Sequence, residues 1–218
     1  MTFTFSIRTA LKKAWGLFAK HPYFFMGLAL VMAILSAFSH TREGHGTPSS
    51  IALFVLVMIA SVIWSYVWIS ATLAAVDGHS DLLNFRFISQ HMPSLRQFFT
   101  LIGVGLLVGI IVAAGFILLI IPGFYFLVRL VFANTAYVDR QQGVRASLKY
   151  SWHLVQGKIY WTVFLVLLLE IGLFILGTIP FMIGLLVTYP LGMLLMTILY
   201  RDLTVYQKSL SEIPAETL

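Results

Sequence analysis

The chain has 218 residues, of which 60% are hydrophobic and only 10% are charged, and its mean hydropathy is +0.94. Soluble domains draw about a quarter of their residues from the charged types, so this composition excludes a soluble globular protein. The 14 Lys and Arg outnumber the 8 Asp and Glu by six, an excess that we attribute to membrane topology rather than to nucleic-acid binding. The absence of cysteine excludes disulfides, thiolate metal sites and cysteine nucleophiles.

Six apolar runs are long enough to cross a bilayer as helices, which takes about 20 residues each. They lack the alternating pattern of a membrane barrel. Breaks at 121–123 and 178–180 separate neighbouring runs and predict tight turns. We expect an all-α, polytopic membrane protein that forms one integral membrane domain over residues 1–218, with no residues left for a separate catalytic domain. Its expected spans are about 22–39, 51–76, 98–121, 123–138, 159–178 and 181–200.

The basic residues predict the orientation of these spans, because loops rich in Lys and Arg stay on the cytoplasmic side. With six spans and both termini inside, twelve of the fourteen basic residues are cytoplasmic, Arg42 is outside and Arg129 is within a span. Five or seven spans would scatter these charges to both faces. The first run follows a basic flank of about twenty residues and is not followed by an A-x-A-like site, so we expect it to remain uncleaved.

Two segments, Ile7–Phe18 and Val144–Val155, align without gaps at an offset of 137 residues and share five identical positions. Their less polar positions recur at helical spacing, which predicts amphipathic helices over 6–20 and 143–157 lying in the cytoplasmic interface. Segment 81–92 is a candidate third copy, which would make the chain repeated units of interfacial helix plus hairpin; the alternative is coincidence among common linkers. The expected headgroup contacts are Arg8, Lys12, Trp15, Arg145, Lys149 and Trp152.

A signature in the second half of the chain resembles a known family. It comprises Pro122-Gly123, a helix with the single arginine Arg129, the acidic Asp139, and then the segments 146–152 and 157–158, A-S-L-K-Y-S-W and G-K. Over about residues 120–170 this order is similar to that of the YciC-like bacterial inner-membrane proteins, which are related to the membrane domain of glycerophosphoryl diester phosphodiesterases. The resemblance implies a six-span protein of the bacterial inner membrane with a link to lipid metabolism. It does not imply phosphodiesterase activity, because in the fused enzymes that chemistry belongs to a separate barrel domain.

Two charged residues fall within expected spans, Arg129 in the fourth and Glu170 in the fifth. Charged side chains are costly inside a membrane and are therefore candidates for function. Counted from the outer ends of their helices, they lie six and eight residues in, at depths of about 9 and 12 Å. Similar depth and opposite sign predict a salt bridge between neighbouring helices. The alternative is that both residues line a polar cavity that binds a lipid headgroup or an ion.

Small residues predict where helices pack closely. Gly105, Gly109 and Ala113 recur at four-residue spacing in the third expected span, a pattern that lets a second helix approach. We expect internal packing of the helix bundle along this stripe, with a homodimer seam as the alternative. In the sixth expected span, Pro190 interrupts the helix and is expected to bend it.

The chain shows no catalytic or metal-binding motif. His40 and His45 share an outer loop and His79 stands between Asp77 and Asp81, but neither group has third and fourth ligands at convincing spacing, so we expect no metal. No G-x-S-x-G elbow, P-loop or zinc-protease motif is present. Two isolated charges fall short of a nucleophile, a base and a stabilising group. We therefore expect a protein that is not an enzyme and needs no cofactor.

These observations favour a non-enzymatic membrane protein that binds or organises lipid or supports envelope homeostasis. Its expected partners are membrane lipids, with other membrane proteins or further copies of the chain as additional candidates, and no nucleic acid. The first alternative is an accessory or scaffolding subunit, which an exposed glycine groove facing lipid would support. A small transporter is a further alternative, and it would need more polar residues within the spans.

Overall fold

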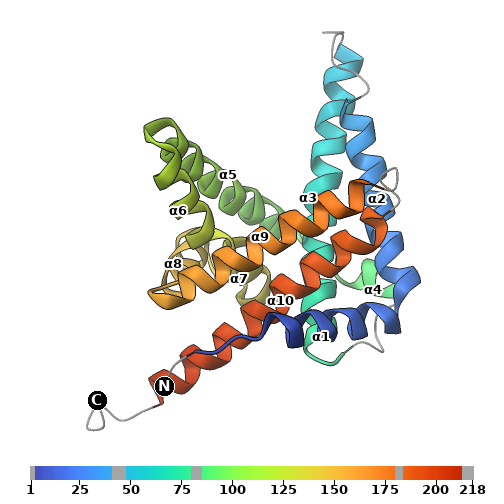
Figure 1. The fold of residues 1–218 in the computed structure, drawn as a ribbon. Helices are drawn as coiled ribbons and strands as arrows, with labels where there is room; N and C mark the ends of the chain where they lie inside the picture. The colour runs from blue at the N-terminus through green and yellow to red at the C-terminus, as the bar shows by residue number, and fades with distance from the viewer. Residues whose placement is uncertain (1–2, 41–47, 80–84, 180–183, 213–218) are drawn as a thin grey trace.

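A computed structural model describes residues 3–40, 48–79, 85–179 and 184–212 (Figure 1). Within these ranges 87% of the residues are helical and none forms a strand, which confirms the all-α prediction. The expected outer-loop residues Arg42 and His45, and Asp81, lie outside the described residues. The helices are α1 (Ile7–Lys20), α2 (Pro22–His40), α3 (Pro48–Val76), α4 (Phe85–Gln90), α5 (Leu95–Leu118), α6 (Ile120–Leu130), α7 (Ala133–Arg140), α8 (Val144–Leu154), α9 (Lys158–Thr178) and α10 (Leu185–Ser211).

A sharp corner joins α1 to α2. Ser6 caps α1 by accepting a hydrogen bond from the Thr9 backbone N–H at 3.4 Å. Pro22 is the first residue of α2, where its missing N–H is not needed, and its ring disfavours helical backbone at His21. The two helices therefore meet at a bend of 94°.

The turn between α5 and α6 lies earlier than the sequence predicts. We expected the break at Pro122-Gly123, but Leu119 is the extended residue that reverses the chain, with φ −166° and ψ 153°. Proline is tolerated in the first turn of a helix, so Pro122 does not stop α6. Gly123 instead faces Gly115: a Cβ added at Gly115 would lie 2.9 Å from the Gly123 Cα atom, so the two glycines let the helices touch.

The fourth expected span, 123–138, is two helices rather than one. α6 ends at Leu130 and α7 begins at Ala133, with the Phe132 backbone at φ −89° and ψ 4° between them. The sequence between these helices is continuously apolar, so hydropathy could not reveal the break. Their combined stretch, Ile120–Arg140, is nonetheless long and apolar enough to cross a membrane.

The last helices form an antiparallel pair (Figure 1). Gly157, at φ +56°, makes the corner between α8 and α9, a conformation that side chains with a Cβ rarely adopt. α10 continues to Ser211, beyond the expected end at residue 200, and Pro190 lies inside it. Residues 180–183, where the sixth span was expected to begin, lie outside the described residues.

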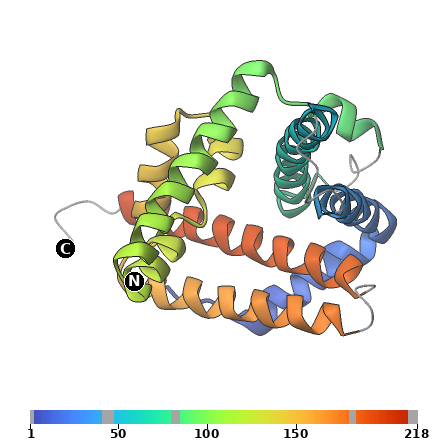
Figure 2. The same ribbon diagram turned by 90° about the horizontal axis from the view of Figure 1, so that it is seen from above.

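Helix α10 runs through the middle of the molecule, with the α2–α3 hairpin on one side and α9 on the other (Figure 2). It supplies much of the buried core, together with large side chains from α2, α3 and α7. The largest fully buried side chains include Trp68, Tyr200, Phe25, Phe132, Leu194, Leu195 and Leu199. The core therefore lies along α10, where α1, α2, α3 and α9 pack against it.

Four segments of the described chain are long and apolar enough to cross a membrane, and the bent pair α1–α2 would add a fifth. Their outward faces expose large apolar side chains, such as Ile117 at 86% and Ile121 at 83% exposure. Because such surfaces are stable only in an apolar solvent, these features are those of a membrane protein. The segments are Ile51–Val76, Leu95–Leu118, Ile120–Arg140 and Lys158–Thr178.

Candidate functional site

One flank of α1 carries the three residues expected to contact headgroups. Arg8, Lys12 and Trp15 recur at i, i+4 and i+7, which places them on the same side of the helix. All three are exposed, Trp15 by 54%. The opposite face is buried against α10 through Ala14 and Phe18. α1 is therefore amphipathic, with Arg8 and Lys12 on its exposed side.

These cations are not engaged elsewhere in the described chain. Arg8 and Lys12 form no hydrogen bond or ion pair with any residue that the structure describes. Lys13, on the other flank, lies close enough to Asp202 of α10 to influence it: burial raises the pKa of the Asp202 carboxyl and the positive charge of Lys13 partly offsets that rise. Arg8 and Lys12 thus remain available to a ligand, whereas Lys13 interacts with α10.

Helix α8 repeats part of this arrangement. Arg145 and Lys149 are exposed, and Ser147 and Ser151 are buried at the positions that Ala10 and Ala14 occupy in α1. Trp152 differs from Trp15 because it is half-buried and packs against α6, whereas Trp15 is exposed and contacts only Phe18 of its own helix among the ring contacts of the described residues. The two aligned segments therefore share cations and small buried residues but not the environment of their tryptophan. The start of the candidate third copy lies outside the described residues, and α4 spans only 85–90.

Arg129 is held by α8 and not by an acidic partner. Its Nη1 donates to the Trp152 carbonyl oxygen at 2.9 Å and to the carbonyl oxygen of Val155, two acceptors at the C-terminal end of α8. Its Nε and Nη2 donate to the Tyr125 hydroxyl at 3.1 and 2.9 Å, and the guanidinium lies over the Trp152 ring at 4.4 Å. A cation at this helix end complements the helix dipole and its free carbonyls. Arg129 therefore fastens α8 to α6.

Glu170 lies elsewhere, at the crossing of α9 and α10. A Cβ added at Gly192 of α10 would lie 3.1 Å from its Cγ atom, so the carboxyl group packs directly on the backbone of α10. No ion pair in the described part of the chain includes Arg129 or Glu170. The expected salt bridge between them is therefore wrong. Similar depths follow only if the helix of Arg129 begins at Gly123, whereas α6 begins at Ile120 and Arg129 lies at its end beside α8.

The described residues contain an ionic cluster that the sequence analysis did not anticipate. Arg201 of α10 binds Asp77 at the end of α3 at 2.5 Å and Asp139 of α7 at 2.8 Å. The Tyr200 hydroxyl donates to Asp139 at 2.8 Å. Burial would lower the pKa of Arg201, but its hydrogen bond to Asp77 and the charge of Asp139 raise it. Each of the three charged residues directly follows an apolar segment of the sequence. This shared position could have predicted that they meet.

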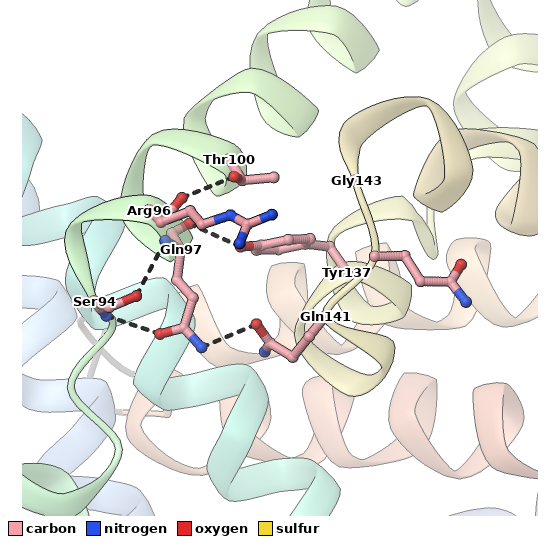
Figure 3. Close-up of a pocket in the computed structure, with 8 residues that line it drawn as sticks. Ser94, Arg96, Gln97, Thr100, Tyr137, Gln141 and Gly143 are labelled. Atoms are coloured by element: carbon pink, nitrogen blue, oxygen red, sulfur yellow. Dashed lines mark hydrogen bonds between the residues drawn. The ribbon is translucent and has the colours of Figure 1, made fainter.

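A polar pocket of about 300 Å³ lies at the start of α5 (Figure 3). Ser94 and Gln97 form a capping box, and the Gln97 side chain donates to the Gln141 side chain at 2.9 Å. Gln141 in turn donates to the Tyr66 hydroxyl of α3 at 2.9 Å. These amides satisfy one another and join α3, α5 and the end of α7. Among the residues lining the pocket, only Arg96 carries a charge.

The small-residue stripe on α5 does not pack inside the described structure. Gly105, Gly109 and Ala113 are exposed, and a Cβ added at either glycine would meet nothing within 4 Å. The expected internal packing along this stripe is therefore wrong. The close helix crossing uses Gly115 and Gly123 instead, because the tight turn at Leu119 brings those two positions together.

Comparisons with known proteins add no family to these observations. No family model, curated protein or solved structure matches the chain.

Proposed function

We propose that this chain is a non-enzymatic, six-span protein of the bacterial inner membrane that binds anionic lipid headgroups through α1. The observation that carries the proposal is the 94° corner between α1 and α2 together with the exposed side chains of Arg8, Lys12 and Trp15. If α2 crosses the bilayer, a helix at right angles to it lies in the membrane plane. A free cationic flank with a tryptophan is then placed among the headgroups.

Anionic lipids give the membrane surface a negative potential, which attracts the cations of α1. Each Lys or Arg near such a surface contributes about 1 kcal/mol of attraction. Arg145 and Lys149, exposed on α8, supply a second set of contacts. Trp15 adds an amphipathic ring suited to the boundary between headgroups and acyl chains.

The ionic cluster supports six spans, and the basic residues near the ends of the spans favour a cytoplasmic location for both termini. Asp77, Asp139 and Arg201 end the second, fourth and sixth expected spans, and the three side chains are in contact. Ends of even-numbered spans lie on one side of a membrane only when each pair of spans forms a hairpin that returns to that side. The sixth span is then the apolar part of α10 before Arg201. The resemblance to YciC-like inner-membrane proteins points the same way, toward lipid and away from phosphodiester hydrolysis.

The test is native mass spectrometry of the full chain released from nanodiscs that contain both phosphatidylglycerol and phosphatidylcholine. We expect wild-type protein to retain phosphatidylglycerol selectively. Lys12→Gln should lower that preference about fivefold, the equivalent of about 1 kcal/mol for one cation. Lys208→Gln, which removes an exposed lysine from the end of α10 that lies 4.0 Å from Glu212, is the control and should change the preference less. Equal retention by wild type and Lys12→Gln would falsify binding through α1.

A scaffolding role is the second candidate, and the exposed stripe of Gly105, Gly109 and Ala113 favours it. A flat, small-residue surface on a membrane helix allows the backbone of another helix to approach. The same mass spectra distinguish the two functions. A second protein chain retained in constant ratio, without selective lipid, would support a subunit of a larger membrane assembly.

A further inference from the structure

The crossing of α9 and α10 contains a pocket of about 240 Å³ that the proposed headgroup binding does not use. Its single charged group is Glu170, which packs on α10 because position 192 is a glycine. The pocket is lined by Leu167, Glu170, Ile171 and Phe174 of α9 and by Thr188, Tyr189 and Gly192 of α10.

The carboxyl group of Glu170 has no partner in the described chain. No hydrogen bond or ion pair connects it to any residue that the structure describes. Thr188, whose hydroxyl also lines the pocket, already donates to the Gly184 carbonyl at 3.2 Å. A lone carboxyl group among apolar side chains is strongly disfavoured in its ionised form, so it either holds a proton or is neutralised by a cation. A bound cation would therefore favour the ionised form of Glu170 and be attracted to it.

The lining favours an organic ammonium over a metal ion. Phe174 and Tyr189 contribute aromatic rings, whose faces attract ammonium groups, and Tyr189 is fixed by packing on Trp68 with ring centroids 5.1 Å apart. A hard metal ion would need several oxygen ligands, and this lining offers one carboxylate. Carboxylate plus aromatic rings is the recognition chemistry of amines.

The pocket is open toward the bilayer rather than toward water. Ile171 and Phe174, on its rim, are 54% and 51% exposed on α9, one of the helices long enough to cross a membrane. A ligand that enters here has an apolar part in the lipid. We propose that this pocket binds the ammonium group of a membrane-partitioned amine, with Glu170 as its counter-ion and Phe174 and Tyr189 beside it.

The experiment uses the full chain in dodecyl maltoside micelles, which contain no competing lipid ammonium, and dodecyltrimethylammonium as the probe. Adducts counted by native mass spectrometry over a concentration series give the apparent affinity. We expect one bound probe per wild-type chain and an affinity at least tenfold lower in Glu170→Gln. Gly192→Ala, whose new methyl group displaces the carboxyl, should also weaken binding. Glu212→Gln, at an exposed glutamate, is the control and should bind like wild type.

Two further ligands distinguish binding at this site from non-specific binding of amphiphiles. Dodecanol, which has the same chain and no charge, should bind wild type and Glu170→Gln equally, and this also shows that the variant is folded. Tetramethylammonium, which stays in water, should bind much more weakly than the amphiphile; equal affinity would overturn entry from the bilayer. Equal binding of dodecyltrimethylammonium by wild type and Glu170→Gln overturns the site itself. Neither result depends on α1, so headgroup binding can fail or succeed independently.

A pH series supplies a readout that a structural role for Glu170 would not affect. The quaternary ammonium probe does not titrate, and Tyr189, the other titratable residue lining the pocket, is a phenol that already carries its proton at neutral pH and takes up none on acidification. Acidification should therefore weaken binding in wild type as the carboxyl takes up a proton. Binding by Glu170→Gln should not vary with pH. A flat profile in both proteins would contradict the role of the carboxylate.

Discussion

Single side chains decide which of the two intramembrane charges is structural. Arg129 satisfies two carbonyl oxygens at the end of α8, the Tyr125 hydroxyl and the face of Trp152. Each of these groups would otherwise lie without a donor or a cation in a region poor in water. Among the described residues, Glu170 has no hydrogen-bond or ion-pair partner. Arg129 therefore stabilises the fold, whereas Glu170 is the residue open to a ligand.

We expect Arg129→Leu to lower the free energy of unfolding by about 2 kcal/mol, because it removes hydrogen bonds to a charged group and leaves the carbonyls of α8 unpaired. Arg129→Lys keeps the charge but not the planar guanidinium group. Its free energy of unfolding should lie between those of the wild type and Arg129→Leu. Unfolding of the purified protein in mixed micelles measures both.

The double variant tests whether the two charges interact. Arg129 and Glu170 share no partner in the described chain, so their effects should add within about 0.5 kcal/mol. A larger deviation from additivity in Arg129→Leu/Glu170→Leu would show that the two side chains interact, in contradiction to the observed geometry.

At the scale of helices, two pairs of glycines show which part of α5 packs closely against another helix and which part is exposed. Gly115 lies against the backbone of Gly123, and this contact holds the α5–α6 hairpin closed. Gly109 and Gly105, about two and three turns nearer the start of the same helix, face open space. Both pairs read alike in the sequence, as small residues at four- or eight-residue spacing. Only the position of the turn at Leu119 separates a packing glycine from an exposed one.

Gly115→Ala should therefore destabilise the protein measurably, by about 1 to 3 kcal/mol, because the new methyl group meets backbone atoms that cannot move aside. Gly109→Ala on the same helix is the matched control. It should leave stability unchanged or raise it, since alanine favours helix over glycine by about 1 kcal/mol. Thermal unfolding in detergent checks both; equal losses would mean that the two sites are packed alike. A change in oligomeric state confined to Gly109→Ala would support the scaffolding function.

At the scale of the whole molecule, one arginine links three helices that are distant in the chain. Arg201 contacts the end of α3 and α7 while its own helix crosses α1, α2 and α9. A partly buried network of this kind depends on all members being present, because removing one leaves charges unpaired. It fixes the ends of α3, α7 and the apolar part of α10 on one face of the molecule.

The absence of cysteine makes the topology directly measurable, since any introduced cysteine is the only thiol. With six spans, Gln142→Cys between α7 and α8 and Lys208→Cys on α10 should react with a membrane-impermeant maleimide only after cells are permeabilised. His45→Cys, in the expected outer loop, should react in intact cells. Labelling of Gln142→Cys in intact cells would contradict both the span count and the orientation.

Much of the architecture could be predicted from composition and periodicity. The limits of α1, α3, α8 and α9 match the expected segments within a few residues, because apolar content and amphipathic spacing act locally. The break between α6 and α7, the turn at Leu119 and the extension of α10 could not be predicted, since each lies where the local pattern is uniform or ambiguous. Hydropathy measures how long a segment stays apolar and does not indicate where its backbone changes direction.

The partners of the charged residues required the tertiary structure. The sequence alone determined that the chain is helical, membrane-embedded and basic on one flank of α1, because those properties depend on residue type and spacing. Only the fold decided that Arg129 binds carbonyl oxygens, that Arg201 joins Asp77 and Asp139, and that Glu170 has no partner among the residues that the structure describes. Such pairings depend on which helices cross and at what height, and neither is encoded in the neighbouring residues of the chain.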